Sequence, residues 1–382
     1  MVNENTDDCS QSSSTTRRAF LTAAGAAGVT GTAGCLGGIT GSGGGSATTL
    51  EVLTWEEYAE LKEDIESRLD VTVNFTKSTS SSKMFSGWKS GQDAQYDIAV
   101  PNNNYVPKMV DADLVAPVPS DAVSNYDSTY DKFQSFAESQ FTKDGTMYGV
   151  PIRFGWYGYS YDSRKIPTDH EKSYDVLFSD SYEGTDLSGQ IIMYDNHFKA
   201  MSAAALYLGY RDAFTGSKIT LSEKQIDEVK QTMKEQKSLL QGYIAADPTY
   251  IKSFKQGNFV IGQSGRNEIV EMKANGTDWA EMAAPKEGSL AWFESAVVSK
   301  KSDNKDMAWK VINEFIAPKL GAKLGKVGYS PSVNPKIQEH LSDSENEMFG
   351  RIDPSRLDSM IPFKAVENED KWLTAWEEIK SA

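Results

Sequence analysis

Hydrophobic positions in the first part of the body predict strands that alternate with amphipathic helices. Apolar residues alternate with other residues over 50–53 and 71–75, as in half-buried strands, and a third strand is predicted at 96–100. Between the first two strands, apolar residues recur at helical spacing. This order favours a mainly parallel α/β sheet. In such sheets ligands bind beyond the carboxyl ends of the strands, here at residues 54–58 and 101–105.

The rest of the chain continues to alternate between strand and helix patterns. The predicted elements, in chain order, are an aromatic-rich extended stretch at 149–161, an α/β segment starting at 187–194, a helix opened by a Ser222–Gln225 capping box with Ile226, Val229, Met233 and Leu240 facing a core, a helix at 248–257, a strand at 259–263, an extended stretch at 291–298, and a helix carrying Trp309, Ile312, Phe315 and Ile316. Ser264 and Gly265 are expected to form a turn. Trp372 and Trp376 are expected on one face of a later helix.

The N-terminal residues instead predict export and tethering. Arg17-Arg18 precedes an Ala/Gly-rich stretch that is too short to span a bilayer permanently, and it resembles a twin-arginine export signal. Thr32-Ala33-Gly34-Cys35 resembles a lipobox, although Thr32 departs from the usual first residue. We therefore predict a signal at residues 1–34, a lipid on Cys35 and a flexible Gly/Ser tether at 35–49. The alternative is a disordered tail in which the arginine pair has no role.

Composition narrows the class of the exported body. The chain has 382 residues with 39 Lys+Arg and 54 Asp+Glu, and its formal charge of −15 makes nonspecific nucleic-acid binding unfavourable. No apolar run of about 20 residues suits a membrane span, and both cysteines lie in the first tenth of the chain, which excludes a disulfide scaffold. A body longer than about 300 residues is expected to form two lobes.

Patterns typical of enzymes are weak or absent in the sequence. The histidines are far apart and form no metal-type pair: His170, His197 and His340. Gly262-Gln263-Ser264-Gly265 lacks the spacing of a nucleophile elbow, and no phosphate-binding Gly-rich loop is present. A stripe of alternating tyrosines is expected to pack or to line a cleft, in preference to binding a metal: Tyr157, Tyr159 and Tyr161. Asn74 and Asn275 lie in glycosylation sequons.

Two clusters place an aromatic ring beside a carboxylate, which suits an organic cation. Trp292 and Glu294 project from the same face of a predicted strand, and a desolvated ring contributes about 0.5–2 kcal/mol to cation binding. The alternative places Trp292 in the core and Glu294 in solvent, and the residues alone do not separate the two interpretations. At the first strand–helix joint, Thr54 and Glu57 match a capping box, so residue physics alone favours Glu57 as a helix cap.

Six short motifs occur in the order and spacing of one family. They are Leu53-Thr54-Trp55-Glu56-Glu57-Tyr58, Tyr96-Asp97-Ile98-Ala99-Val100-Pro101, Tyr148-Gly149-Val150-Pro151, Ala284-Pro285-Lys286-Glu287-Gly288, Trp292-Phe293-Glu294-Ser295 and Val327-Gly328-Tyr329-Ser330-Pro331. Over residues 50–382 the chain thus resembles the spermidine/putrescine-type extracellular solute-binding proteins of ABC importers. The resemblance implies a type II periplasmic-binding-protein fold, an α/β fold with two lobes that are joined by crossing strands and close on a ligand. We predict lobe 1 at 50–155 plus 296–330 and lobe 2 at 156–295 plus 331–382, with the assignment of the C-terminal segment left open.

The resemblance also assigns candidate ligand-binding residues. They are Trp55, Glu57, Tyr58, Asn102, Asn104, Asp195, Gln263, Trp292, Glu294 and Tyr329. Within this set, Asn102, Asn104 and Gln263 stand where the family has other side chains. Near the retained Asp195, Asn196 and Lys199 stand where the family presents acidic groups, and a cationic Lys199 would repel a second ammonium or pair with Asp195. A shorter ligand, or one that carries its own carboxylate, is therefore also considered.

The function implied is capture of a small organic cation, a polyamine such as putrescine or spermidine, by lobe closure and its delivery to a membrane permease. We expect a lipid-anchored monomer on the outer face of the cytoplasmic membrane, with no catalysis, no cofactor and no nucleic-acid partner. The alternatives are the same fold with a thiamine-like cation, an amino-acid derivative or a metal chelate, and, in another class, an exported enzyme. The acidity and the lipoprotein signal resemble proteins of salt-loving archaea. In strong salt the Debye length falls to about 3 Å, so selectivity has to come from a few desolvated groups.

Overall fold

Strands from both halves of the body join in one 10-stranded mixed sheet, in which eight strands follow the order β10-β9-β11-β6-β13-β3-β1-β2 while β12 pairs with β6 and β14 with β13. The computed structural model describes residues 48–382, so the predicted signal, Cys35 and most of the tether lie outside the described residues. The strands are β1 (Thr48–Thr54), β2 (Val71–Lys77), β3 (Ile98–Ala99), β6 (Val150–Asp162), β9 (Ile191–Tyr194), β10 (Leu240–Ile244), β11 (Ile261–Gly265), β12 (Ala280–Ala283), β13 (Ser289–Val298) and β14 (Met360–Pro362), with two small hairpins, β4 (Thr142–Lys143) with β5 (Thr146–Met147) and β7 (Ser181–Tyr182) with β8 (Thr185–Asp186).

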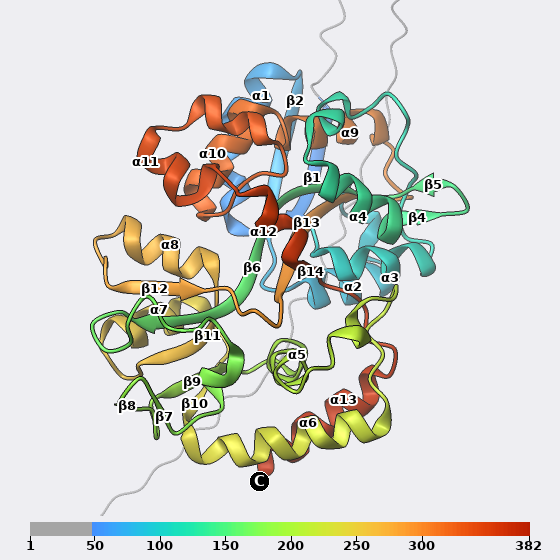
Figure 1. The fold of residues 1–382 in the computed structure, drawn as a ribbon. Helices are drawn as coiled ribbons and strands as arrows, with labels where there is room; N and C mark the ends of the chain where they lie inside the picture. The colour runs from blue at the N-terminus through green and yellow to red at the C-terminus, as the bar shows by residue number, and fades with distance from the viewer. Residues whose placement is uncertain (1–47) are drawn as a thin grey trace, which may run out of the picture. The chain divides into compact units, whose positions relative to one another are not determined.

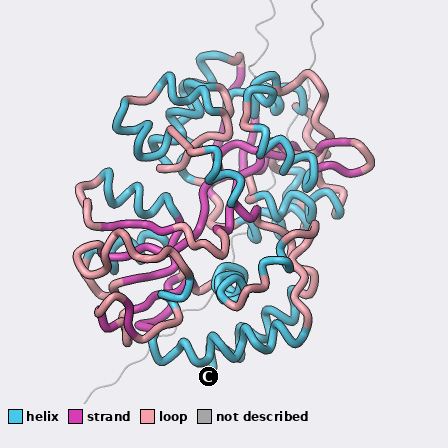
Figure 2. Tube along the Cα trace, viewed as in Figure 1, coloured by secondary structure: helices cyan, strands magenta, loops and turns pink. Residues whose placement is uncertain are grey.

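Helices flank the strands throughout the described part of the chain (Figure 2). They are α1 (Lys62–Arg68), α2 (Ser81–Lys89), α3 (Val106–Asp111), α4 (Asp131–Phe141), α5 (His197–Tyr207), α6 (Glu223–Gln236), α7 (Asp247–Lys255), α8 (Arg266–Ala274), α9 (Lys305–Phe315), α10 (Pro318–Gly328), α11 (Asp343–Glu345), α12 (Pro354–Ser359) and α13 (Glu369–Ser381). Between residues 48 and 382, no helix has the length and apolarity that a bilayer crossing requires.

The strands β6 and β13 connect two large hydrophobic cores (Figure 1). One core surrounds β1, β2 and β3, and we call the part of the protein built around it lobe 1. The other core surrounds β9 and β11 and defines lobe 2. A smaller hydrophobic cluster lies around α7 and α8. On β6 the change from one core to the other falls between Trp156 and Tyr157. The neighbours β1–β2 and β9–β10 are parallel, whereas β6 and β13 pair antiparallel, so the predicted parallel pattern holds within the lobes and the crossing strands depart from it.

The C-terminal segment contributes to both cores. Val333 and Leu357 pack in the core of lobe 1, whereas Trp372 and Trp376 on α13 pack in the core of lobe 2 against α6. We propose that the boundary between the lobes in this segment lies near Met360, and the division of the remaining residues stays a prediction.

Of the two capping boxes predicted from the sequence, one is present in the structure and the other is not. The predicted Ser222–Gln225 capping box is confirmed at the start of α6. The Thr54–Glu57 box is wrong: Trp55 is the N-cap of the 3-10 helix that begins at Glu56, and its side chain makes no capping hydrogen bond. The reason is that the Glu57 carboxylate turns toward Arg153 instead.

Two element boundaries also differ from the prediction. Leu240 starts β10 and does not continue α6, because α6 ends at Gln236 and a 3-10 turn at Lys237–Leu239 separates them. Ser264 and Gly265 are not a turn but the end of β11, where they pair with Gly158 and Tyr157 of β6. Small residues fit there because this strand is buried on both sides.

Candidate ligand-binding site

A cleft of about 860 Å³ lies at the carboxyl ends of strands from both lobes. In lobe 1 it is lined by residues that follow β1 and β3, including Trp55, Glu57 and Asn102. In lobe 2 it is lined by residues that follow β9 and β10, including Lys199 and Asp247. Both strand–helix joints singled out from the sequence therefore face this cleft, as expected for a parallel α/β sheet.

The cleft wall in lobe 1 rests on a buried ion pair. Arg153 on β6 stands opposite Glu294 on β13 in the strand register, and its Nε and Nη2 donate to the two Glu294 oxygens at 2.6 and 2.8 Å. Arg153 is 3% exposed and Glu294 is 4% exposed. The Tyr58 hydroxyl also donates to Glu294, at 2.7 Å. With both oxygens occupied, Glu294 has little capacity left for a ligand.

Arg153 extends this network to the edge of the cleft. Its Nη2 lies 3.2 Å from Oε1 of Glu57, which lines the cleft. Burial raises the pKa of Glu57, but the Arg153 charge, hydrogen bonds to the carboxylate and the Lys77 charge together outweigh burial, and the net pKa lies below the ordinary value. The guanidinium is 5.6 Å from the centre of the Tyr58 ring. A Cβ at Gly328 would lie 1.7 Å from Arg153 Nη1, so any larger residue here would displace the Arg153 guanidinium.

The cleft wall in lobe 2 holds a second cation, Lys199 near the start of α5. Its Nζ lies 4.3 Å from the centre of the Tyr157 ring and 4.1 Å from that of Tyr194. In residues 48–382 no carboxylate lies within ion-pair distance of it, and Asp195 pairs with Lys380 instead, at 2.9 Å. Desolvation lowers the pKa of Lys199, and the charges of Asp247 and Glu268 oppose this effect.

Glu268 lies beneath this wall. It is fully buried, and the Tyr194 hydroxyl is hydrogen-bonded to its Oε1 and lies 3.2 Å from Oδ1 of Asp247. Burial and the Asp247 charge raise the pKa of Glu268 to about 8. Glu268 therefore keeps its proton to a higher pH than an exposed carboxyl does, and Asp247 lies at the surface of the cleft.

The ten residues proposed from the resemblance separate into two groups. Those that line the cleft are Trp55, Glu57, Asn102, Asn104 and Tyr329. Those that do not are Tyr58, Asp195, Gln263, Trp292 and Glu294. Tyr329 ends α10 in the left-handed conformation, with φ 51°, which turns the chain at the cleft wall.

The residues of the second group have other partners. Gln263 is buried and its Nε2 donates to the backbone oxygen of Lys199 at 2.8 Å, so it fixes the start of α5. Trp292 packs flat against Gly155, where an added Cβ would lie 2.6 Å from the ring. Tyr58 and Glu294 belong to the Arg153 network. These residues support the cleft from behind.

Arg153 and Asp247 were missed by the sequence analysis. For Arg153 a signal was present, because it is the one charged residue within the apolar and aromatic run from Val150 to Tyr161. A charge inside such a buried strand requires a partner, and the partner stands directly opposite on β13. Asp247 had no comparable signal, since an acidic residue in a first helical turn is ordinary.

The lining of the cleft is acidic and aromatic. Its carboxylates are Glu56, Glu57, Glu60, Asp247, Glu271 and Glu369, and its lysines are Lys77 and Lys199. Glu56, Glu57 and Glu369 are paired with basic side chains of the protein. Across the described chain, no basic side chain lies within ion-pair distance of Glu60, Asp247 or Glu271. Rings that face the same space come from Trp55, Tyr105, Tyr157, Phe198, Tyr329 and Phe363.

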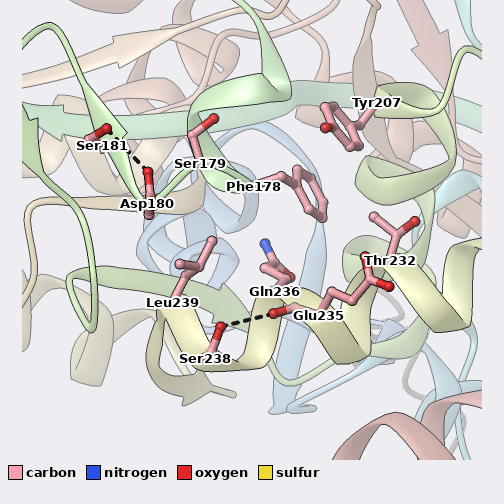
Figure 3. A pocket seen from close by; sticks show the side chains of 10 residues that line it. All are labelled: Phe178, Ser179, Asp180, Ser181, Tyr207, Thr232, Glu235, Gln236, Ser238 and Leu239. Atoms are coloured by element: carbon pink, nitrogen blue, oxygen red, sulfur yellow. Dashed lines mark hydrogen bonds between the residues drawn. The ribbon is translucent and has the colours of Figure 1, made fainter.

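A second cavity, of about 470 Å³, lies in lobe 2 between α6 and the loop at residues 178–181 (Figure 3). Phe178 stacks on Tyr207 at one side, with ring centres 4.3 Å apart. The Ser181 hydroxyl donates to Asp180 at 3.2 Å, and the Ser238 hydroxyl donates to the backbone oxygen of Glu235 at 3.1 Å. The cavity contains none of the ten proposed residues. The cleft is therefore the stronger candidate for the ligand site.

Comparison with known proteins identifies the family. The model of the bacterial extracellular solute-binding proteins matches residues 60–348, which is more than half of the chain. The chain belongs to this family. A spermidine/putrescine-binding periplasmic protein of Salmonella typhimurium is 22% identical over 297 residues, covering 77% of this chain and 80% of the relative. A putrescine/agmatine-binding protein of Pseudomonas aeruginosa is 23% identical over 266 residues, covering 64% of this chain and 69% of the relative.

Solved structures agree on the fold of this family member. The spermidine/putrescine ABC transporter substrate-binding protein of Streptococcus pneumoniae superposes with a TM-score of 0.73 at 18% identity, covering 87% of this chain and 99% of that structure. The predicted two-lobed α/β binding-protein fold is confirmed. At this identity the likeness concerns the fold, and the ligand has to be argued from the cleft itself.

Proposed function

We propose that the protein is the solute-binding component of an ABC importer and that it binds an organic amine of the polyamine class, such as putrescine or spermidine, in the cleft. The observation that supports this proposal best is the lining of the cleft, where six carboxylates face two lysines. Ammonium groups are bound by carboxylates and by the faces of aromatic rings, and the cleft offers both. The named ligands of the two relatives point to the same class.

Asp247 and Glu271 are the best candidates to bind an ammonium group in lobe 2. Both line the cleft and neither has a basic partner within ion-pair distance among residues 48–382. Desolvation and the charge of Asp247 raise the pKa of Glu271, so the two carboxylates repel each other. A ligand ammonium placed beside them would relieve this repulsion. In lobe 1 the half-buried Trp55 is available for a contact with the alkyl chain or an ammonium, and its Nε1 is fixed by a 2.8 Å hydrogen bond to Val100.

The test is titration calorimetry with putrescine and spermidine on the wild type, Asp247→Asn and Asp195→Asn. We expect Asp247→Asn to weaken amine binding about tenfold or more, since a hydrogen bond to a charged group contributes about 1.5–3 kcal/mol. Asp195→Asn is the matched control, because the same chemical change falls on a carboxylate that is outside the cleft and tied to Lys380. Absence of amine binding by the wild type, or equal effects of the two variants, would contradict the proposal.

The transport partner, the export route and the lipid anchor are proposed from the family and from the N-terminal sequence. The protein releases its ligand unchanged to a permease, and it is exported by the twin-arginine route and held by a lipid on Cys35 as a monomer. Intact-mass measurement of the exported protein and light scattering check the lipid and the monomer. A thermal-shift panel with thiamine, amino-acid derivatives and metal chelates separates the polyamine class from the other ligands that this fold could hold.

A further inference from the structure

We infer that Arg153 is a specificity-determining residue: it acts as an internal cation that keeps Glu294 from the ligand, so that the cleft pairs two ammonium groups of an amine and a third adds no affinity. This inference rests on the proposed function. It makes a distinction within the polyamine class, between diamines and longer triamines.

The surroundings of Arg153 are those that an organic cation would require. One carboxylate holds the guanidinium through two hydrogen bonds of 2.6 and 2.8 Å, a second carboxylate, Glu57, lies at 3.2 Å, and the Tyr58 ring lies at 5.6 Å. Carboxylates and an aromatic ring around one cation are the groups expected in an ammonium site. Here the protein's own side chain fills that site.

This internal site adjoins the cleft. Glu57 and Gly328 both line the cleft, and both contact the Arg153 guanidinium from the cleft side. Nη1 of Arg153 is buried and has no hydrogen-bond partner within the described residues. Replacing the arginine head group with a shorter apolar side chain would thus open space next to Glu57 and expose Glu294 to a ligand in the cleft.

The carboxylates that remain free account for two ammonium groups. Glu60 lies on the lobe 1 side and Asp247 with Glu271 on the lobe 2 side, and along residues 48–382 none of them has a basic partner at ion-pair distance. A third ammonium would need the Glu57–Glu294 pair, which Arg153 already neutralises. Burying that third charge without a counter-charge is unfavourable, so a triamine gains nothing over a diamine.

The experiment measures the ratio of spermidine to putrescine affinity by calorimetry in three proteins. For the wild type we expect spermidine to bind no more tightly than putrescine. In Arg153→Met the ratio should shift toward spermidine about tenfold, the change expected for one added charge-assisted hydrogen bond. In the charge-balanced control Arg153→Met/Glu294→Gln the ratio should shift less than in Arg153→Met, because the Glu294 carboxylate is removed together with the cation and only Glu57 is freed. Circular dichroism verifies that each variant is folded.

The outcomes separate this inference from the proposed function. If the wild type binds amines and Arg153→Met keeps its ratio, the inference is wrong and the proposed function stands. If no protein binds either amine, both fail. Arg153→Gln, which keeps a hydrogen-bond donor for Glu294, serves as a second variant if Arg153→Met does not fold. If neither variant folds, the wild type alone decides. Wild-type binding of spermidine ten times tighter than that of putrescine would overturn the inference. Tighter binding of γ-aminobutyrate than of putrescine would also overturn it, because the cleft would then prefer a ligand with one ammonium group and one carboxylate.

Discussion

Arg153 in lobe 1 and Lys199 in lobe 2 are both cations at the wall of the cleft, and they are stabilised in different ways. Arg153 is held between two strands by bidentate hydrogen bonds to Glu294 and by Glu57. Lys199 lies over the faces of Tyr157 and Tyr194 without a carboxylate at ion-pair distance in the described residues. Arg153 is thus paired with two carboxylates, whereas Lys199 faces the ligand space with its charge only partly compensated.

The pKa shifts follow this difference. Burial lowers the pKa of Arg153, but Glu294 and Glu57 outweigh burial and the net pKa is raised. For Lys199 burial prevails over the attraction of Asp247 and Glu268, and the pKa is lowered. The planar guanidinium suits a fixed pair between two strands, whereas an ammonium on a flexible stem readily changes its protonation when buried. The comparison indicates that lobe 1 supplies a rigid support and lobe 2 an adjustable charge.

The largest effect is expected from breaking the pair in lobe 1. Arg153→Met leaves Glu294 buried and unpaired, so we expect the free energy of unfolding to fall by about 3–5 kcal/mol, measured by urea unfolding. Arg153→Met/Glu294→Gln should lose much less, because no uncompensated charge remains. If the losses of Arg153→Met and Glu294→Gln, measured separately, add up to the loss of the double variant, the pair is not coupled, and the description of lobe 1 as a rigid ion-paired support is wrong.

The next expected effect concerns lobe 2 and is measured as a change of stability per pH unit. The pKa of Glu268 is raised from 4.5 to about 8, so between these values the folded protein holds a proton that the unfolded chain has released. Stability therefore falls as pH rises through this window, by at most about 1.4 kcal/mol per pH unit. In Glu268→Gln this slope should be reduced, as judged by urea unfolding at pH 5, 6.5 and 8.

The control for this experiment is Glu339→Gln, which makes the same change at an exposed position. It should keep the wild-type slope. If Glu268→Gln keeps that slope as well, burial of the Glu268 carboxyl does not govern the pH response of lobe 2.

The sequence predicted where the cleft lies better than which residues line it. The spacing of hydrophobic residues predicted strand–helix joints at residues 54–58 and 101–105, at the carboxyl ends of parallel strands. Residues of both joints line the cleft. This succeeded because sheet topology follows from local periodicity and from a general rule about strand ends. Trp292 and Glu294 were correctly expected to share a strand, but their partners could not be known before the pairing of β6 with β13.

The partners decide what each charged residue is free to do. Glu294 looked available for a ligand and is bound by Arg153, 141 residues away in the chain. Asp195 looked available and is bound by Lys380 at the C-terminus. Pairing over such distances depends on the assembled tertiary structure, and neither period nor composition encodes it. A prediction of site residues from charge type alone therefore overestimates the number of free carboxylates.

The smallest expected effect bears most directly on the contrast between paired and unpaired cations. Lys199→Met removes a positive charge that lies at the cleft near Asp247, so amine binding should strengthen by about two- to fivefold, or about 0.5–1 kcal/mol. Lys77→Met is the matched variant, because Lys77 also lines the cleft but is paired with Glu56, and removing it frees a carboxylate at the exposed rim. Its effect should be smaller, since both side chains of that pair are largely exposed and screened by solvent. The measurement is the putrescine affinity of both variants relative to the wild type, determined by calorimetry. Weaker putrescine binding by Lys199→Met would mean that the Lys199 charge does not oppose the bound amine, and the contrast between a paired and an unpaired cation would then not extend to ligand binding.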